Sequence, residues 1–110
     1  MEPKFELIVC IVNSGYSNLV VDAARSAGAG GGTIMNARGS ANPQTEKLFN
    51  ISVDPEKELI MIVVKKTIAD KVLTAVYDHA GLASDAAGIA FSMPIDDIVG
   101  LPKKQYENLE

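Results

Sequence analysis

The side chains that most often carry out catalysis are scarce in this sequence. It contains one histidine, His79, and one cysteine, Cys10, so a zinc site lacks the other ligands of these types that it needs. Asp96 and Asp97 beside Pro94 are interpreted as an exposed turn, and neither a GxSxG motif nor a Walker motif is present. We therefore expect no catalytic residue, no bound metal and no enzymatic activity.

Two glycine-bearing segments indicate a different chemistry, the binding of an anion. Segments 28–33 and 81–88 are rich in glycine and small residues, which let main-chain N–H groups approach an anion without obstruction. The same composition also serves a simple connection from a helix to a strand. Arg38 opens a polar segment, and its guanidinium group could bind a phosphate or carboxylate through two hydrogen bonds. From the residues alone, both interpretations of the glycine segments remain open.

An internal repeat predicts the elements that position these segments. Residues 6–12 read almost identically to residues 58–64, at an offset of 52. A helical stretch follows each copy, and Gly28 or Gly81 stands where it ends. A strand that begins with glycine comes next in both copies. Each copy is therefore predicted to be a β-α-β unit.

Two such units predict an α+β, ferredoxin-like split β-α-β fold, with an antiparallel sheet and two helices on one face. We expect the first helix over residues 17–27. The second should begin at Thr67 with a start that resembles a capping box. Residues 38–47 are predicted to be an exposed loop and residues 48–53 a short strand. The domain is taken as residues 1–110, with a core over about 4–101 and a polar tail over 102–110.

The predicted central strands indicate self-association. Every residue in 7–12 and in 59–64 is apolar, so both faces of the sheet are apolar, whereas two helices cover only one face. Covering the second face with other copies of the chain removes apolar surface from water, which is favourable by about 25 cal/mol per Å². We therefore expect a homo-oligomer.

Charge and hydropathy exclude two classes of partner and indicate a compartment. Ten basic against fourteen acidic side chains give a net charge of −4, which disfavours nucleic acid and anionic lipid. No apolar run reaches the ~18 residues of a membrane span, and the N-terminus lacks a signal-peptide pattern. We expect a cytoplasmic protein without direct membrane insertion.

The order of these elements resembles the PII signalling superfamily. The resemblance rests on the doubled β-α-β unit, on residues 32–39 before the exposed loop, and on the loop that ends near residues 85–88; it covers about residues 4–101. It implies a homotrimer whose sheets face the threefold axis and which binds adenine nucleotides in clefts between subunits. It also implies that the exposed loop then contacts a regulated partner.

The resemblance places ligand-binding residues in two segments of this sequence. They are Thr33, Ala37, Arg38 and Gly39 in the first, and Gly81, Ser84, Asp85, Ala87 and Gly88 in the second. The family's phosphate-binding lysine is replaced by Ala87 or Gly88, and the predicted C-terminal strand, residues 95–101, lacks the family's arginines. Fewer positive charges favour a less charged ligand, such as a monophosphate, a cyclic nucleotide or a small anion.

The short loop resembles the PII-like branch of the superfamily, some of whose members are associated with membrane transport proteins. The resemblance thus implies a homotrimeric sensor that requires no cofactor. Its expected effector is a small anion such as AMP, ADP, ATP or cyclic AMP, and its client a membrane transporter. A metal-tolerance protein resembling the CutA family and a small acylphosphatase-like enzyme are the alternatives. The scarcity of histidine and cysteine and the lack of an arginine-lined cradle disfavour them.

Overall fold

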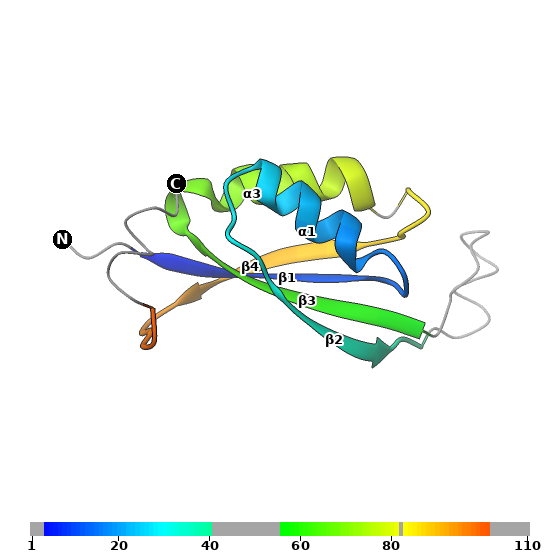
Figure 1. Cartoon of the computed structure of the whole chain (residues 1–110), viewed down its shortest axis with the longest axis horizontal. Coiled ribbons are helices and arrows are strands. Elements are labelled where there is room, and N and C mark those ends of the chain that lie inside the picture. The colour runs from blue at the N-terminus through cyan, green and yellow to red at the C-terminus, as the bar shows by residue number, and fades with distance from the viewer. Residues whose placement is uncertain (1–3, 41–55, 82, 102–110) are drawn as a thin grey trace.

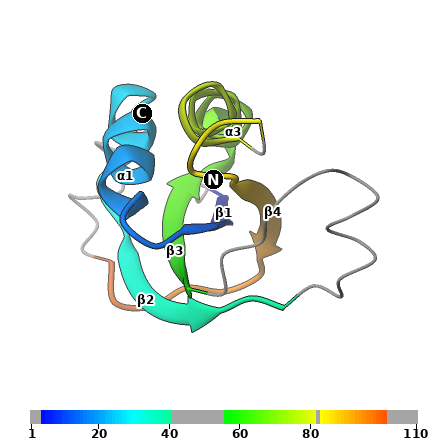
Figure 2. The same ribbon diagram turned by 90° about the vertical axis from the view of Figure 1, so that its right-hand side faces the viewer.

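A computed structural model of the chain describes residues 4–40, 56–81 and 83–101 (Figure 1). Four strands form one antiparallel sheet in the order β2-β3-β1-β4. Both helices pack on the same face of it (Figure 2). This arrangement confirms the predicted α+β, ferredoxin-like fold. The elements are β1 (Phe5–Asn13), α1 (Ser17–Ser26), β2 (Thr33–Arg38), β3 (Glu56–Lys65), α3 (Lys66–Ala80) and β4 (Ile89–Ile95).

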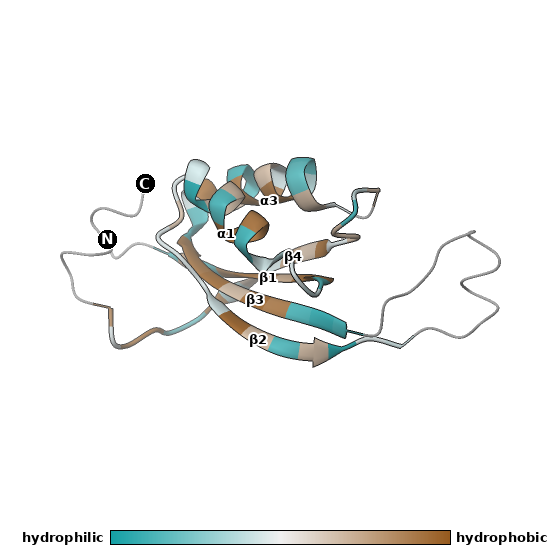
Figure 3. Cartoon of the chain, turned by 45° about the vertical axis from the view of Figure 1, so that its right-hand side comes forward, coloured by the Kyte–Doolittle hydropathy of each residue, from teal (hydrophilic) through white to brown (hydrophobic). Residues whose placement is uncertain are grey.

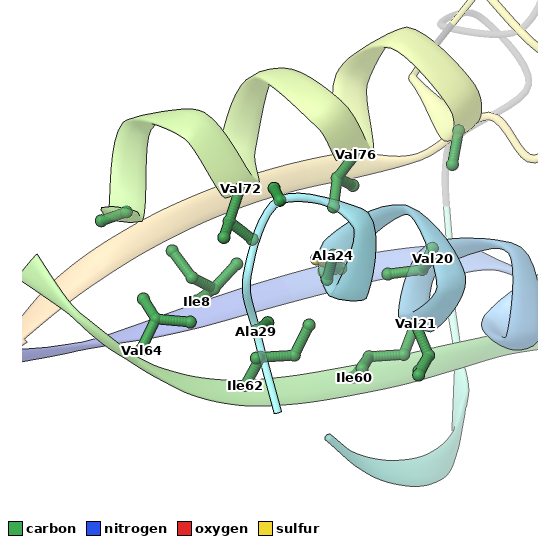
Figure 4. Close-up of a cluster of buried hydrophobic side chains, with 14 of the residues drawn as sticks. Ile8, Val20, Val21, Ala24, Ala29, Ile60, Ile62, Val64, Val72 and Val76 are labelled. Carbon is green, nitrogen blue, oxygen red and sulfur yellow. The ribbon is translucent and has the colours of Figure 1, made fainter. Parts of the chain in front are cut away.

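The two copies of the repeat lie side by side in the centre of the sheet. Strands β1 and β3 pair antiparallel, with Ile8 opposite Ile62 and Cys10 opposite Ile60. Alternate residues of a strand point to opposite faces, so these four side chains turn together toward the helices. They are fully buried there. Small and β-branched helix residues complete this core, and Figure 4 shows among them Val20, Val21, Ala24, Val72 and Val76.

The start of α3 differs from the sequence-based prediction. The helix begins at Lys66 instead of Thr67, and no side chain caps it. Strand β3 passes directly into the helix at this point, with Lys65 still extended, and the Lys66 N–H donates to the Lys4 carbonyl at 2.9 Å. Thr67 therefore lies inside the helix and cannot act as its N-cap, so the predicted capping box does not form.

The region after β4 also differs from the prediction. Residues 96–101 are irregular, so the strand predicted over residues 95–101 is wrong beyond Ile95. Two aspartates follow Ile95, and Gly100 adopts a positive φ of 101°, both of which disfavour an extended strand.

Residues 41–47 of the predicted loop, the predicted strand over 48–53 and the tail over 102–110 lie outside the described residues. Neither described helix is long and apolar enough to cross a bilayer.

The face of the sheet opposite the helices is apolar. The register places Leu59 opposite Ile11, Met61 opposite Val9, and Val63 opposite Leu7 on this face. Figure 3 shows the hydrophobic colouring along the middle of β1 and β3. Strand β4 adds three large apolar side chains that are about four-tenths to one-half exposed, Ile89, Phe91 and Met93. The helix-free face is thus the apolar surface that the sequence predicts.

Burial makes Cys10 a source of pH dependence. Desolvation raises the pKa of its thiol from 9.0 to about 11, so the unfolded chain ionises this thiol at a lower pH than the folded protein does. The stabilising contribution is complete below pH 9 and is lost as the pH rises toward 11. Between pH 8 and 10 the wild type should lose about 1 kcal/mol more unfolding free energy than Cys10→Ala. Urea titrations across this range test the difference, and parallel curves for the two proteins would contradict it.

Candidate effector-binding site

The second of the two segments that the sequence assigns to a ligand lies at the same end of the sheet as the close of the first, at Arg38 and Gly39. Strand β2 ends at Arg38, strand β3 begins at Glu56, and helix α3 ends at Ala80 just before the second segment. In Figure 1 these ends, together with the turn after β1, all lie on the right. The fold therefore brings residues 38–40, which begin the predicted loop, and the segment before β4 to the same end of the molecule. We call the described residues 81 and 83–88 the second loop.

The second loop is a tight turn closed by its own hydrogen bonds. The Ser84 N–H donates to the Gly81 carbonyl at 2.9 Å, and the Ser84 hydroxyl donates to the same oxygen at 2.6 Å. The Ala87 N–H donates to the Ser84 carbonyl and the Gly88 N–H to the Ala80 carbonyl, both at 2.9 Å. The N–H groups of Ser84, Ala87 and Gly88, which the sequence analysis offered to an anion, are thus used to close the loop and to attach it to the end of α3. An anion at this end has to be bound largely by other groups.

Two glycines of the second loop occupy positions where no side chain fits. A Cβ atom on Gly88 would lie 2.3 Å from the Ala80 carbonyl oxygen, and one on Gly81 would lie 2.7 Å from the Tyr77 carbonyl oxygen. These close approaches allow Gly81 and Gly88 to form a parallel bridge across the loop. By contrast, Ala87 has a φ of 48°, in the left-handed region that favours glycine.

The first segment splits between the two faces of β2. Thr33 and Ala37 pair with Met61 and Lys57 and therefore lie on the helix-free side, whereas Arg38 lies on the other side, opposite Glu56. Arg38 is exposed. Thr33 begins β2 and Arg38 ends it, which separates them by roughly 17 Å at about 3.3 Å per residue. A single chain therefore does not bring Thr33 to the second loop.

Three polar residues at this end were missed by the sequence analysis. Lys57 Nζ donates to Asn13 Oδ1 at 2.5 Å, and Asn13 Nδ2 donates to the Asp85 carbonyl at 3.2 Å. Glu58 Oε1 accepts the Gly15 N–H at 2.8 Å, just before α1. The sequence holds a signal for two of them. Asn13 directly follows the first apolar strand and Lys57 comes just before the second, so antiparallel pairing of these strands places the two residues side by side. Figure 3 shows the start of β3 as its hydrophilic part.

An apolar groove of about 450 Å³ lies beside the second loop, between α3 and β4. The described residues that line it include Tyr77, Gly81 and Ile89 and carry no charge, so they provide no attraction for an anion. Among residues 4–40, 56–81 and 83–101, no three histidine, cysteine, aspartate or glutamate side chains lie close enough together to bind one metal ion. Within the described ranges, Arg38 and Lys57 supply the positive charges at this end of the sheet.

Solved structures of PII proteins share this fold. Arabidopsis thaliana PII bound to citrate is 24% identical, with a TM-score of 0.67 and coverage of 91% of this chain and 82% of that one. Bacillus subtilis GlnK in complex with ATP is 19% identical, with a TM-score of 0.65 and coverage of 86% and 84%. CPII from Thiomonas intermedia K12, bound to ADP, AMP and acetate, is 16% identical, with a TM-score of 0.64 and coverage of 84% and 87%.

The sequence itself identifies the family. No curated protein matches the chain at a significant level. The family described as nitrogen regulatory protein P-II matches residues 5–105, which span every described element. The chain therefore belongs to the P-II family of signalling proteins.

Proposed function

We propose that this P-II family protein is a cytoplasmic, homotrimeric sensor of a small anionic effector, an adenine nucleotide, which binds in clefts between subunits. The exposed loop over residues 38–47 then regulates a partner, of which a membrane transport protein is the first to test. The effector acts through its different affinities for two states of the loop. The proposed ligand contacts are Thr33, Ala37, Arg38, Gly39, Gly81, Ser84, Asp85, Ala87 and Gly88.

The observation that carries this proposal is that two positive charges and the second loop lie at the same end of the sheet, with Arg38 on its helix side and Lys57 on its helix-free side. Arg38 ends β2, and Lys57 Nζ lies within hydrogen-bond distance of Asn13, which in turn contacts Asp85. The similar structures contain ATP, ADP and AMP, or citrate, all of which are anions. The position of Thr33, far from the second loop of its own chain, supports a cleft to which two copies contribute.

The charge of the site favours an effector smaller than a triphosphate. Ala87 and Gly88 provide no ammonium group in the second loop, and three of its amide groups are engaged internally. Each phosphate group that lacks a cationic partner keeps an unfavourable desolvation cost on binding. We therefore expect AMP, ADP or cyclic AMP to bind more tightly than ATP.

Arg38→Ala should weaken effector binding by about ten- to hundredfold, because a charge-assisted contact contributes about 1.5–3 kcal/mol. Isothermal titration of the wild type with AMP, ADP, ATP, cyclic AMP and bicarbonate identifies the effector. Titration of the variant with that effector then measures the loss. Arg25→Ala removes an exposed arginine from the last turn of α1 and serves as the control. Silent titrations of the wild type with all five compounds would overturn the sensor proposal.

A further inference from the structure

The Asn13 side chain connects the two segments of the candidate site. Its carbonyl oxygen accepts a hydrogen bond from Lys57 Nζ at 2.5 Å, and its amide group donates to the Asp85 carbonyl at 3.2 Å. The Asn13 main-chain N–H donates to the Ala86 carbonyl at 2.9 Å. One residue at the end of the central strand β1 therefore holds the second loop on one side and a lysine of β3 on the other.

Lys57 continues this connection to the base of the exposed loop. It is the register partner of Ala37 on β2 and of Asn13 on β1. Its methylene groups also pass close to Gly39, since a Cβ atom on that glycine would lie 3.0 Å from Lys57 Cε. A continuous series of contacts thus runs from Gly39 through Lys57 and Asn13 to Asp85.

The chemistry of this connection requires asparagine at position 13. The carboxamide provides an acceptor for the ammonium group and a donor for the carbonyl group at the same time. Aspartate would keep the acceptor for Lys57 but could not donate to the Asp85 carbonyl at neutral pH. The two halves of the connection can therefore be broken separately, by Asn13→Asp on one side and by Lys57→Met on the other.

We propose that Asn13 is a positioning residue that couples the second loop to the base of the exposed loop. In this role, which rests on the proposed effector site, an effector that orders the second loop also orders residues 37–39 through Lys57. The coupling needs no large movement, because a hydrogen bond shared by two segments makes the local opening of one depend on the other.

Hydrogen exchange in the ligand-free protein tests the connection itself. Lys57→Met should accelerate exchange of the Ala87 and Gly88 amides by about three- to tenfold, because Asn13 without its lysine partner holds Asp85 less firmly and the loss of one hydrogen bond corresponds to about this factor. Amides of Ile62 and Val72 in the core should be unchanged. Lys66→Met, at the exposed start of α3, is the matched control and should leave Ala87 and Gly88 at wild-type rates.

Asn13→Asp should accelerate the same amides to a similar extent, and the double variant with Lys57→Met should add little to either single change, because both break one connection. Unchanged exchange of Ala87 and Gly88 in Lys57→Met would overturn the proposal. Fully additive effects of the two substitutions would overturn it as well.

Hydrogen exchange measured with added effector distinguishes this inference from the proposed function. With ADP as the probe, protection in the wild type should extend from the second loop to Ala37 and Gly39, whereas in Asn13→Asp it should stay within the second loop. Protection that reaches Ala37 equally in both proteins contradicts the coupling role. If the wild type shows no change with ADP or with the other titrated compounds, the sensor proposal fails, while the ligand-free exchange still decides whether the connection exists.

Discussion

Gly88→Ala should destabilise the protein by about 3 kcal/mol or more, a large part of the roughly 5–15 kcal/mol that holds a domain of this size together. The added methyl group would lie 2.3 Å from the Ala80 carbonyl oxygen and 2.7 Å from Val12 Cγ1. Neither atom can move easily, because Ala80 closes α3 and Val12 is buried in the central strand. The strain would also break the Gly88 N–H bond to Ala80. Urea unfolding measures the loss.

Ala87→Gly is the matched test at the neighbouring position, and it should not destabilise the protein. A φ of 48° costs a non-glycine residue about 1–2 kcal/mol, and glycine removes this strain at the expense of some additional chain entropy. Stability should remain unchanged or rise by up to about 1 kcal/mol. A Gly88→Ala variant as stable as Ala87→Gly would show that the second loop adapts freely, in contradiction to the packing described above.

The fold was predictable because its strongest signals are local and occur twice. The repeat over residues 6–12 and 58–64 became the two central strands, and the small residues of the first helix became a buried helix face. The predicted ends of elements were wrong where a neighbouring segment, and not the local sequence, determines the structure. Strand β3 leads directly into α3, so the capping residues at Thr67 were not needed, and residues 96–101 have no strand partner among the described residues.

The candidate site was less predictable because it depends on register. Glycine segments and Arg38 are visible in the sequence, but Asn13 and Lys57 become neighbours only when β1 and β3 pair in one specific alignment. A shift of one residue would place Lys57 on the opposite face from Asn13. The hydrogen bonds that engage the amide groups of the second loop likewise depend on how the loop turns in space, which the sequence does not reveal. Sequence composition could therefore indicate an anion but could not indicate which groups remain to bind it.

The helix-free face gives the trimer proposal its most direct test, with the substitution Phe91→Asp. Phe91 lies on that face in the edge strand β4, opposite Val9 of β1, and is 42% exposed in the single chain, so a charge there costs the isolated fold little. In an assembly that buries this face, each copy would bring an unpaired carboxylate into an apolar contact, which costs several kcal/mol. The variant should therefore be monomeric at micromolar concentration by light scattering, and it should lose effector binding together with the clefts.

Leu19→Asp provides the control for this test, because Leu19 is similarly exposed, at 37%, but belongs to α1 in the helical layer. It exchanges a large apolar side chain for the same charge on the side of the molecule that the proposed assembly leaves in water. We expect this variant to keep the mass of the wild-type assembly. A wild-type protein that is itself monomeric, or a Phe91→Asp variant with unchanged mass, would show that the apolar strands do not assemble through this face. Pockets between copies would then have no physical basis.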